Sequence, residues 1–242
     1  MILGRIDSRK SRLLQEILAA KNAPSENGFI IEGVKFVADC NPDSVRTVFL
    51  TNATKHADIA SKFENVYEIS SQVADKISSA VSGQEVIALV FKKNPVQPKK
   101  LILLDDVQDS GNVGTIIRTA SALGFGVVAS EASANPYSVK TARSTAGAIL
   151  SCFVERACLE RKIAELKKDG YYIYSTELDI TANLLKNADP PEKFAVIIGN
   201  EGNGVHKEIS ALSNEKIYIP IKKENSLNAS VAAGITMYVM GM

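Results

Sequence analysis

Phe194-Ala-Val-Ile-Ile-Gly-Asn-Glu-Gly-Asn-Gly204 decides the fold, because an uninterrupted apolar run leads directly into a loop of glycines and amides. Residues 194–198 have the composition and length of a strand that is buried on both faces of a parallel sheet. A second β-like run at 216–220 leads in the same way into a polar loop at 221–228. Ligands bind at the carboxyl edge of open α/β sheets, so we expect the two loops to form a pocket there.

The alanine-rich run over residues 229–242 predicts a helix that follows the second loop. Ser226, Asn228 and Ser230 surround its start, where such side chains can cap a helix. The run is too short and too rich in small residues to span a bilayer, and the charged N-terminus has no apolar signal region. We therefore expect a soluble cytoplasmic protein without a membrane partner.

The chain has 242 residues, with 28 Lys and Arg residues against 27 Asp and Glu residues. This balance excludes a polycation that coats nucleic acid indiscriminately, so contacts with RNA would have to come from local basic patches. Cys40, Cys152 and Cys158 are odd in number and scattered, which fits free thiols in a reducing compartment. Only His56 and His206 could serve a zinc site or a Ser-His-Asp hydrolase, so we expect no metal.

The N-terminal part of the chain alternates short strands and helices over residues 1–92, which predicts a small α/β domain. A stretch at 92–100 then holds two prolines and four lysines without an apolar period, so residues 93–100 are interpreted as a linker. Residues 101–242 again alternate strands and helices. They predict a second α/β domain, built on a parallel sheet.

The first strand of this second domain leads into a loop, expected at 105–114, and then into a helix expected at 115–123. Glycines in the loop let backbone come close to a ligand, and Asn112 offers both a hydrogen-bond donor and an acceptor. Arg118 lies one helical turn past Gly114. On its own, this pattern is also typical of a tight turn with an exposed arginine on the next helix.

Gly199, Gly202 and Gly204 raise the alternative of a dinucleotide-binding loop. Their spacing is reversed relative to G-x-G-x-x-G, and no clear acidic ribose ligand ends a following second strand. The sequence also lacks the G-x-x-x-x-G-K-[ST] motif of a P-loop. Hydrolysis by paired carboxylates is a further alternative, but nothing in the sequence fixes two carboxylates near one another.

Three loops taken together resemble the signature motifs of the SpoU (TrmH-like) branch of the SPOUT methyltransferases. Asn112 and Arg118 follow one strand, Gly199-Asn-Glu-Gly-Asn-Gly204 follows a second, and Ile219-Pro220 with Ser226-Leu-Asn228 follows a third. This family transfers a methyl group from S-adenosylmethionine to a ribose 2′-hydroxyl of RNA. The resemblance implies the same activity and the same cofactor for this chain.

The resemblance extends over residues 101–242 and includes 136–148, which is similar to the family's segment between its first two motifs. Phe29-Ile-Ile-Glu-Gly33 resembles part of the ribosomal-protein-like substrate domain that often precedes the catalytic domain. The family therefore implies an RNA substrate-binding domain at 1–92 and a catalytic domain with a C-terminal trefoil knot, a rare exception to the avoidance of knots. It also implies a homodimer formed through the catalytic domain.

The family's site residues map onto this chain motif by motif. The resemblance implies cofactor contacts at Gly199, Asn200, Gly204, Ile219, Leu227 and Asn228. It implies catalytic or positioning roles for Asn112, Arg118, Glu201, Ser226 and Asn228. In accounts of the family, the arginine accepts the proton of the ribose 2′-hydroxyl. A guanidinium is, however, effectively always protonated. We therefore expect a cationic Arg118 to clamp phosphate and stabilise the alkoxide, with Glu201 as a competing base or as a partner of the arginine.

Local basic clusters are expected to dock the RNA. They comprise Arg9, Lys10 and Arg12, and, on an expected loop that starts at Asn135, Lys140 and Arg143. A solvated charged face is the alternative interpretation. Ribosomal RNA is favoured over transfer RNA because of the first domain's resemblance. A transfer RNA methyltransferase and a non-catalytic RNA-binding protein of this fold remain open as alternatives.

Overall fold

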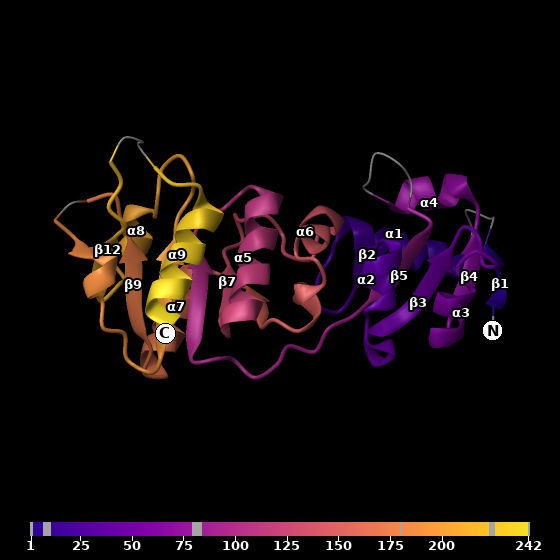
Figure 1. Cartoon of the computed structure of the whole chain (residues 1–242), viewed down its shortest axis with the longest axis horizontal. Helices are drawn as coiled ribbons and strands as arrows, with labels where there is room; N and C mark the ends of the chain where they lie inside the picture. Colours follow the sequence, from indigo (N-terminus) through magenta and orange to yellow (C-terminus); the bar gives the residue numbers. More distant parts are fainter. Residues whose placement is uncertain (1, 7–10, 79–83, 180, 223–225, 242) are drawn as a thin grey trace. The chain divides into compact units, whose positions relative to one another are not determined.

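The computed structural model describes residues 2–6, 11–78, 84–179, 181–222 and 226–241 (Figure 1). Contacts divide the chain into two compact units. Unit 1 consists of Met1–Lys93 with Tyr137–Leu150, and unit 2 consists of Asn94–Pro136 with Ser151–Met242. A segment from the middle of the sequence therefore packs with the N-terminal part of the chain. The domain and linker limits drawn from the sequence stay predictions.

Unit 1 contains a mixed five-stranded sheet with the order β1-β4-β3-β5-β2. Its strands are β1 (Ile2–Ile6), β2 (Phe29–Glu32), β3 (Val45–Leu50), β4 (Val66–Ile69) and β5 (Val86–Val90). β4 pairs in parallel with β1 and β3, whereas β5 pairs antiparallel with β2 and β3. β5 is buried along its whole length, which accounts for its continuous apolar sequence.

The helices of unit 1 are short. They are α1 (Arg12–Asn22), α2 (Val34–Ala38), α3 (Ala57–Lys62), α4 (Ser71–Ile77) and α6 (Val139–Ser144), with the 3₁₀ turns η1 (Pro42–Ser44) and η2 (Ala148–Leu150). Leu14 and Ile17 of α1 are buried in a core that also contains Phe49 and Ile87. The spacing of Leu14 and Ile17, three positions apart, places them on the buried face of an amphipathic helix.

The prediction that Lys140 and Arg143 lie in a loop is wrong, because both residues lie in helix α6. Ser138 caps this helix: its side-chain oxygen accepts a hydrogen bond from the backbone N–H of Thr141 at 3.2 Å. The short helix lies against β2 within unit 1. Capping and packing thus override a sequence whose Asn135-Pro start is typical of a loop.

Unit 2 contains a seven-stranded sheet with the order β10-β12-β9-β11-β6-β7-β8. Its strands are β6 (Lys100–Leu104), β7 (Gly126–Ala129), β8 (Val154–Arg156), β9 (Tyr172–Thr176), β10 (Asn183–Leu184), β11 (Phe194–Ile198) and β12 (Glu215–Tyr218). All neighbouring strands pair in parallel. The predicted α/β class with a parallel sheet is confirmed, whereas the trefoil knot stays a prediction.

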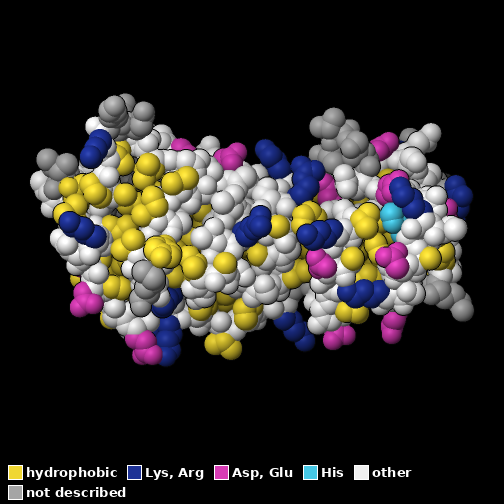
Figure 2. All heavy atoms as spheres, viewed as in Figure 1, with side chains coloured by type: hydrophobic (Ala, Val, Ile, Leu, Met, Phe, Trp, Pro, Cys, Tyr) yellow, Lys and Arg dark blue, Asp and Glu magenta, His cyan; other side chains and the backbone are white. Residues whose placement is uncertain are grey.

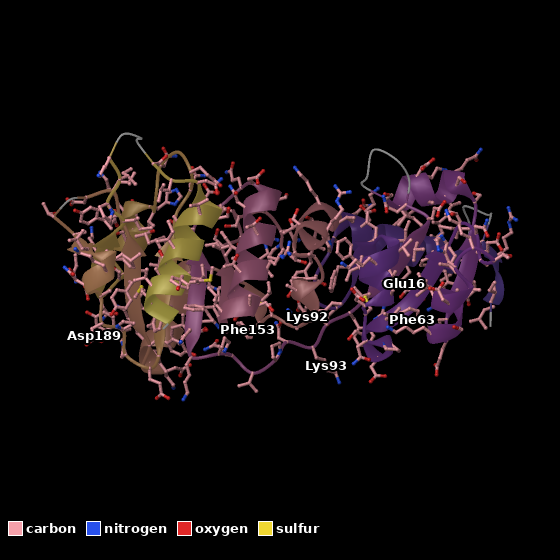
Figure 3. The ribbon with its side chains drawn as sticks, viewed as in Figure 1. Glu16, Phe63, Lys92, Lys93, Phe153 and Asp189 are labelled. Carbon is pink, nitrogen blue, oxygen red and sulfur yellow. The ribbon has the colours of Figure 1, made fainter. Side chains whose placement is uncertain are left out.

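The helices of unit 2 are α5 (Ser110–Leu123), α7 (Leu159–Lys168), α8 (Lys207–Ser210) and α9 (Ala229–Gly241), with the 3₁₀ turn η3 (Leu185–Asn187). Leu159 and Ile163 of α7 pack with Ile173 and Ala195 of the sheet, and Phe153 adds to this core (Figure 3). The C-terminal helix expected over residues 229–242 is confirmed as α9, which packs against α5 and β11. Among the described residues, no helix combines the length and apolar character that a bilayer span needs.

Helix α5 begins at Ser110, five residues before the expected start at Thr115. The reason is a cap: Asp109 Oδ1 accepts a hydrogen bond from the backbone N–H of Asn112 at 2.8 Å. Asn112 and Gly114 therefore lie in the first turns of a helix, not in a free loop. A helical backbone fixes the direction of the Asn112 side chain more tightly than a loop would.

Candidate active site

A pocket of about 440 Å³ lies at the carboxyl edge of the unit 2 sheet. Its walls come from the segments that follow three neighbouring strands, β12, β9 and β11. Glu177 follows β9, Gly199–Val205 follow β11, and Ile219 follows β12, while Leu227 adds a wall from the third loop. The prediction that the two polar loops form one pocket at this edge is confirmed.

The loop after β11 folds back on itself. Asn200 and Gly204 exchange two backbone hydrogen bonds of 3.0 and 2.9 Å. A Cβ on Gly199 would lie only 2.1 Å from the carbonyl carbon of Gly204, so glycine alone fits there. Asn200 Nδ2 donates to the carbonyl oxygen of Asp106 at 2.9 Å, and its Oδ1 accepts from the N–H of Gly202 at 2.8 Å. The loop is therefore rigid and anchored to the end of β6.

A second anchor joins the same two segments. The buried carboxylate of Asp105 accepts hydrogen bonds from the backbone N–H of His206 at 2.7 Å and from its Nδ1 at 3.0 Å. The hydrogen bond that His206 donates to Asp105, and next the negative charge of Asp105, raise the pKa of the His206 imidazole above its ordinary value. His206 lies at the start of α8 with a half-exposed side chain. The pair holds the end of the loop in place.

Side chains from all three motifs meet in one hydrogen-bonded chain. Asn112 Nδ2 donates to Glu201 Oε1 at 2.6 Å, and Asn228 Nδ2 donates to Asn112 Oδ1 at 3.0 Å. Because a carboxylate only accepts, the amide of Asn112 has to present its nitrogen to Glu201 and its oxygen to Asn228. Asn228 Oδ1 in turn accepts from the N–H of Ser230 at 2.9 Å and so caps α9.

Arg118 lies apart from this chain. It is exposed on α5, six residues after Asn112, or about 9 Å further along the helix axis. Within the described ranges, no hydrogen bond or ion pair engages its guanidinium. Ser226, by contrast, lines the pocket. The structure thus brings together all the proposed site residues of the three motifs except the arginine, and the individual roles of these residues stay predictions.

The basic residues proposed to dock RNA differ in their surroundings. Arg143 Nη1 donates to Glu32 Oε1 at 3.1 Å, and the side chain of Glu32 is 0% exposed. Arg143 therefore neutralises a buried carboxylate within unit 1. Arg12 and Lys140 are exposed, while Arg9 and Lys10 lie outside the described residues. An RNA-binding role for these residues stays a prediction.

The pocket also contains acidic residues that the sequence interpretation did not single out. Glu177 and Asp179 follow β9 and line the pocket together with Glu201. The lining residues that the structure describes include no Lys, Arg or His. The sequence signal was limited to position, since Glu177 directly follows the β-like run Tyr172-Ile-Tyr-Ser-Thr176. In the described ranges, no three His, Cys, Asp or Glu side chains gather to hold a metal ion.

S-adenosylmethionine fits this pocket. The volume lies within the range of about 300–1,000 Å³ that is usual for small-molecule sites. Gly199 lets the backbone at Gly204 and Val205 pack directly against it, and this folded loop lines the cavity. A lining whose described residues include Glu177, Asp179 and Glu201 but no Lys, Arg or His suits a ligand that carries a sulfonium. The fold and the site together define an α/β protein with a small-molecule pocket at the carboxyl edge of its parallel sheet.

The SpoU rRNA Methylase family model matches residues 99–238. The chain is 30% identical over 245 residues to the 23S rRNA (guanosine(2553)-2′-O)-methyltransferase RlmP of Bacillus subtilis, with 98% of each chain covered. A putative TrmH family tRNA/rRNA methyltransferase of Staphylococcus aureus is 36% identical over 141 residues, which cover 57% of this chain and 56% of the relative. The chain therefore belongs to the SpoU rRNA methylase family.

Solved structures agree with this assignment. An AdoMet-bound rRNA methyltransferase from Sinorhizobium meliloti superposes with a TM-score of 0.80 at 25% identity, covering 97% of this chain and 96% of the other. The SpoU methyltransferase AviRb from Streptomyces viridochromogenes, with AdoMet, shares the fold at a TM-score of 0.77, with 21% identity and coverage of 95% and 97%. The predicted family, the predicted enzyme class of RNA methyltransferase and the predicted cofactor are confirmed.

Proposed function

We propose that this chain methylates the ribose 2′-hydroxyl of one nucleotide in large-subunit ribosomal RNA, in the cytoplasm. The observation that carries this proposal is the hydrogen-bonded chain Asn228–Asn112–Glu201 beside the cofactor pocket. The relative RlmP, similar over 98% of both chains, is named as a 2′-O-methyltransferase of 23S rRNA, which supports the RNA class. A transfer RNA substrate is the second candidate, because the shorter relatives are named tRNA/rRNA methyltransferases.

The chemistry requires a group that takes the hydroxyl proton. Bound S-adenosylmethionine supplies a methyl group on a cationic sulfur, so transfer neutralises the sulfur while the hydroxyl loses its proton. Glu201 is suited to accept this proton: Oε1 is held by Asn112, and Oε2 has no partner among the described residues. A hydrogen bond from Asn112 fixes the carboxylate at the pocket without occupying its second oxygen.

Arg118 has a different part in the proposal. Its guanidinium carries no partner in the described part of the chain, so its five N–H donors are available to the RNA. A bidentate contact with the phosphate next to the target nucleotide would orient the ribose, and the positive charge would stabilise the developing alkoxide. Arg118 thus acts as a clamp and Glu201 as the base.

A homodimer through the catalytic domain belongs to the same proposal. Val231, Ile235, Tyr238 and Val239 are 50%, 37%, 58% and 39% exposed, and their spacing places them along one side of α9. Figure 2 shows hydrophobic side chains gathered over this helix. An exposed apolar stripe of this kind favours an interface with a second copy, as the family resemblance implies. Tyr238→Glu is expected to yield monomers in light scattering, whereas dimers of this variant would contradict the interface.

Methyl transfer to RNA tests the function directly. Total RNA from a strain that lacks this gene is incubated with the protein and labelled S-adenosylmethionine, and alkali-resistant linkages are mapped. Resistance at one nucleotide of the large-subunit RNA is the expected result. Resistance in transfer RNA would favour the second candidate, and a label that alkali releases in mononucleotides would exclude ribose methylation. Cofactor binding without RNA methylation, also with intact ribosomal subunits, would point to a non-catalytic RNA-binding protein.

A further inference from the structure

Glu177 occupies the position where an acidic residue can reach a bound nucleoside. It directly follows β9, and its backbone N–H donates to the carbonyl oxygen of Ile217 in β12 at 2.9 Å. β9 lies between β12 and β11, so Glu177 stands between the two strands whose loops form the pocket. Its side chain is 20% exposed, and the residue lines the pocket.

One carboxylate oxygen of Glu177 is held by two serine hydroxyls. Ser175 Oγ donates to Oε1 at 3.1 Å, and Ser210 Oγ donates to the same oxygen. Both serines are buried, and Lys216 Nζ lies 3.9 Å from Oε1. Oε2, by contrast, has no hydrogen-bond partner among the described residues. The contacts fix the carboxylate while leaving one oxygen for a ligand in the pocket.

A carboxylate in this place has a well-understood use. At the end of a strand of a parallel sheet, an acidic side chain can accept hydrogen bonds from the hydroxyls of a ribose. We propose that Glu177 binds the ribose hydroxyls of S-adenosylmethionine through Oε2, with Oε1 held by Ser175 and Ser210. The inference rests on the proposed function, since it assigns one part of the same cofactor to one wall of the pocket.

Calorimetric titration of the full chain tests this contact. S-adenosylhomocysteine is one probe, and 5′-methylthioadenosine, which keeps the adenine and ribose but lacks the amino acid, is the other. Glu177→Gln is expected to lower the affinity for both probes by about 10-fold, because a hydrogen bond to a charged group is lost or becomes neutral. Glu177→Asp keeps the charge but withdraws the oxygen by one methylene, and it is expected to weaken both probes as well. A loss confined to S-adenosylhomocysteine would place Glu177 at the amino acid and overturn the proposal.

Deoxy analogues sharpen the assignment. Removing the 2′- or 3′-hydroxyl of 5′-methylthioadenosine is expected to weaken binding to the wild type, and to weaken binding to Glu177→Gln much less, because the two changes remove the same contact. Equal losses in both proteins would overturn the proposal. Glu208→Gln, on α8 outside the pocket lining, removes the same charge and is expected to bind both probes like the wild type.

The same titrations separate this inference from the proposed function. In one outcome, the wild type binds S-adenosylhomocysteine and methylates RNA, and Glu177→Gln binds both probes as tightly as the wild type. This result would overturn only the role of Glu177. Wild-type protein that binds neither probe would overturn the cofactor site itself. Thermal unfolding of each variant shows whether a lost affinity comes from a lost fold.

Discussion

Glu32 in unit 1 and Glu201 in unit 2 are both glutamates held by hydrogen bonds, but their second oxygens differ. Glu32 has a side chain that is 0% exposed, with Oε1 bonded to Arg143 and Oε2 bonded to Ser78. Glu201 has Oε1 bonded to Asn112, whereas Oε2 has no partner in the described ranges. A carboxylate satisfied on both sides holds a structure together, while one satisfied on one side is prepared for a ligand.

Glu177 shares this arrangement with Glu201, and both residues line the pocket. The anchored oxygen of Glu177 is supported by buried serines, and that of Glu201 by an asparagine that also contacts Asn228. The pocket therefore has two differently supported carboxylates, one set into the sheet edge and one linked to the catalytic motifs. We assign the first to cofactor binding and the second to proton transfer. Variants that change cofactor affinity and the rate of methyl transfer separately test this division of roles.

The largest effect is expected at Glu201. Glu201→Gln keeps the contact with Asn112 but removes the proton acceptor, so methyl transfer is expected to fall by about 10²- to 10⁴-fold. Affinity for S-adenosylhomocysteine is expected to change by less than about 3-fold, well below the tenfold step that 1.4 kcal/mol represents. Single-turnover transfer and calorimetry measure the two quantities, with Glu208→Gln as control. A rate near that of the wild type would assign the proton to another group.

A smaller loss is expected at Arg118. Arg118→Lys keeps the positive charge but loses the planar fork, so transfer is expected to fall by about 10- to 100-fold, as for a lost bidentate contact. Single-turnover transfer measures this loss. Arg161→Lys, the same change at an exposed arginine of α7, is the matched control. Substantial transfer by Arg118→Lys would exclude the bidentate clamp and leave only a point charge.

The sequence predicts elements well where burial dictates composition. Residues 194–198 are apolar without interruption, and β11 has the same limits, because a central parallel strand is buried on both faces. β8 and β10 are short and lack such a run, so no pattern predicts them. The early start of α5 was missed because glycine and serine disfavour helices, and the cap by Asp109 outweighs that cost.

Contacts between segments that are distant in the sequence limit how much of the site the sequence can predict. The family motifs indicated Asn112, Glu201 and Asn228, and the structure joins them although the paired residues lie 89 and 116 positions apart. Glu32 and Arg143 lie 111 positions apart, and no local pattern marks them as partners. Glu177 follows its strand directly, but the sequence does not show that Ser210 of another element holds its carboxylate.

Removing Arg143 tests the structural side of the comparison. Arg143→Ala leaves the buried Glu32 carboxylate with less compensation and is expected to cost about 2 kcal/mol of unfolding free energy, less than for a fully buried pair because Arg143 is 40% exposed. Urea unfolding measures the change. Arg46→Ala breaks an exposed pair with Glu16 and is expected to cost less than about 1 kcal/mol. Glu32→Gln added to Arg143→Ala is expected to restore stability, and equal losses in the two single variants would contradict the distinction.

The smallest effect is expected at His206, the partner of Asp105. The carboxylate of Asp105 is buried like that of Glu32 but lies beside the pocket loop like that of Glu201. Its hydrogen bond and charge raise the pKa of His206 above 6.5, so the protonated imidazole stabilises the folded state. This contribution is complete below pH 6.5, the unfolded value, and is lost as pH rises through the higher folded pKa. His206→Asn keeps a donor near Nδ1 but does not titrate. The difference in unfolding free energy between wild type and His206→Asn is expected to shrink from pH 6 to pH 8.5 by less than about 1 kcal/mol, because the imidazole is half exposed and screened by water. His56 is present in both proteins and cancels, so a difference that stays constant with pH would show that the Asp105–His206 contact holds the loop without the imidazolium charge.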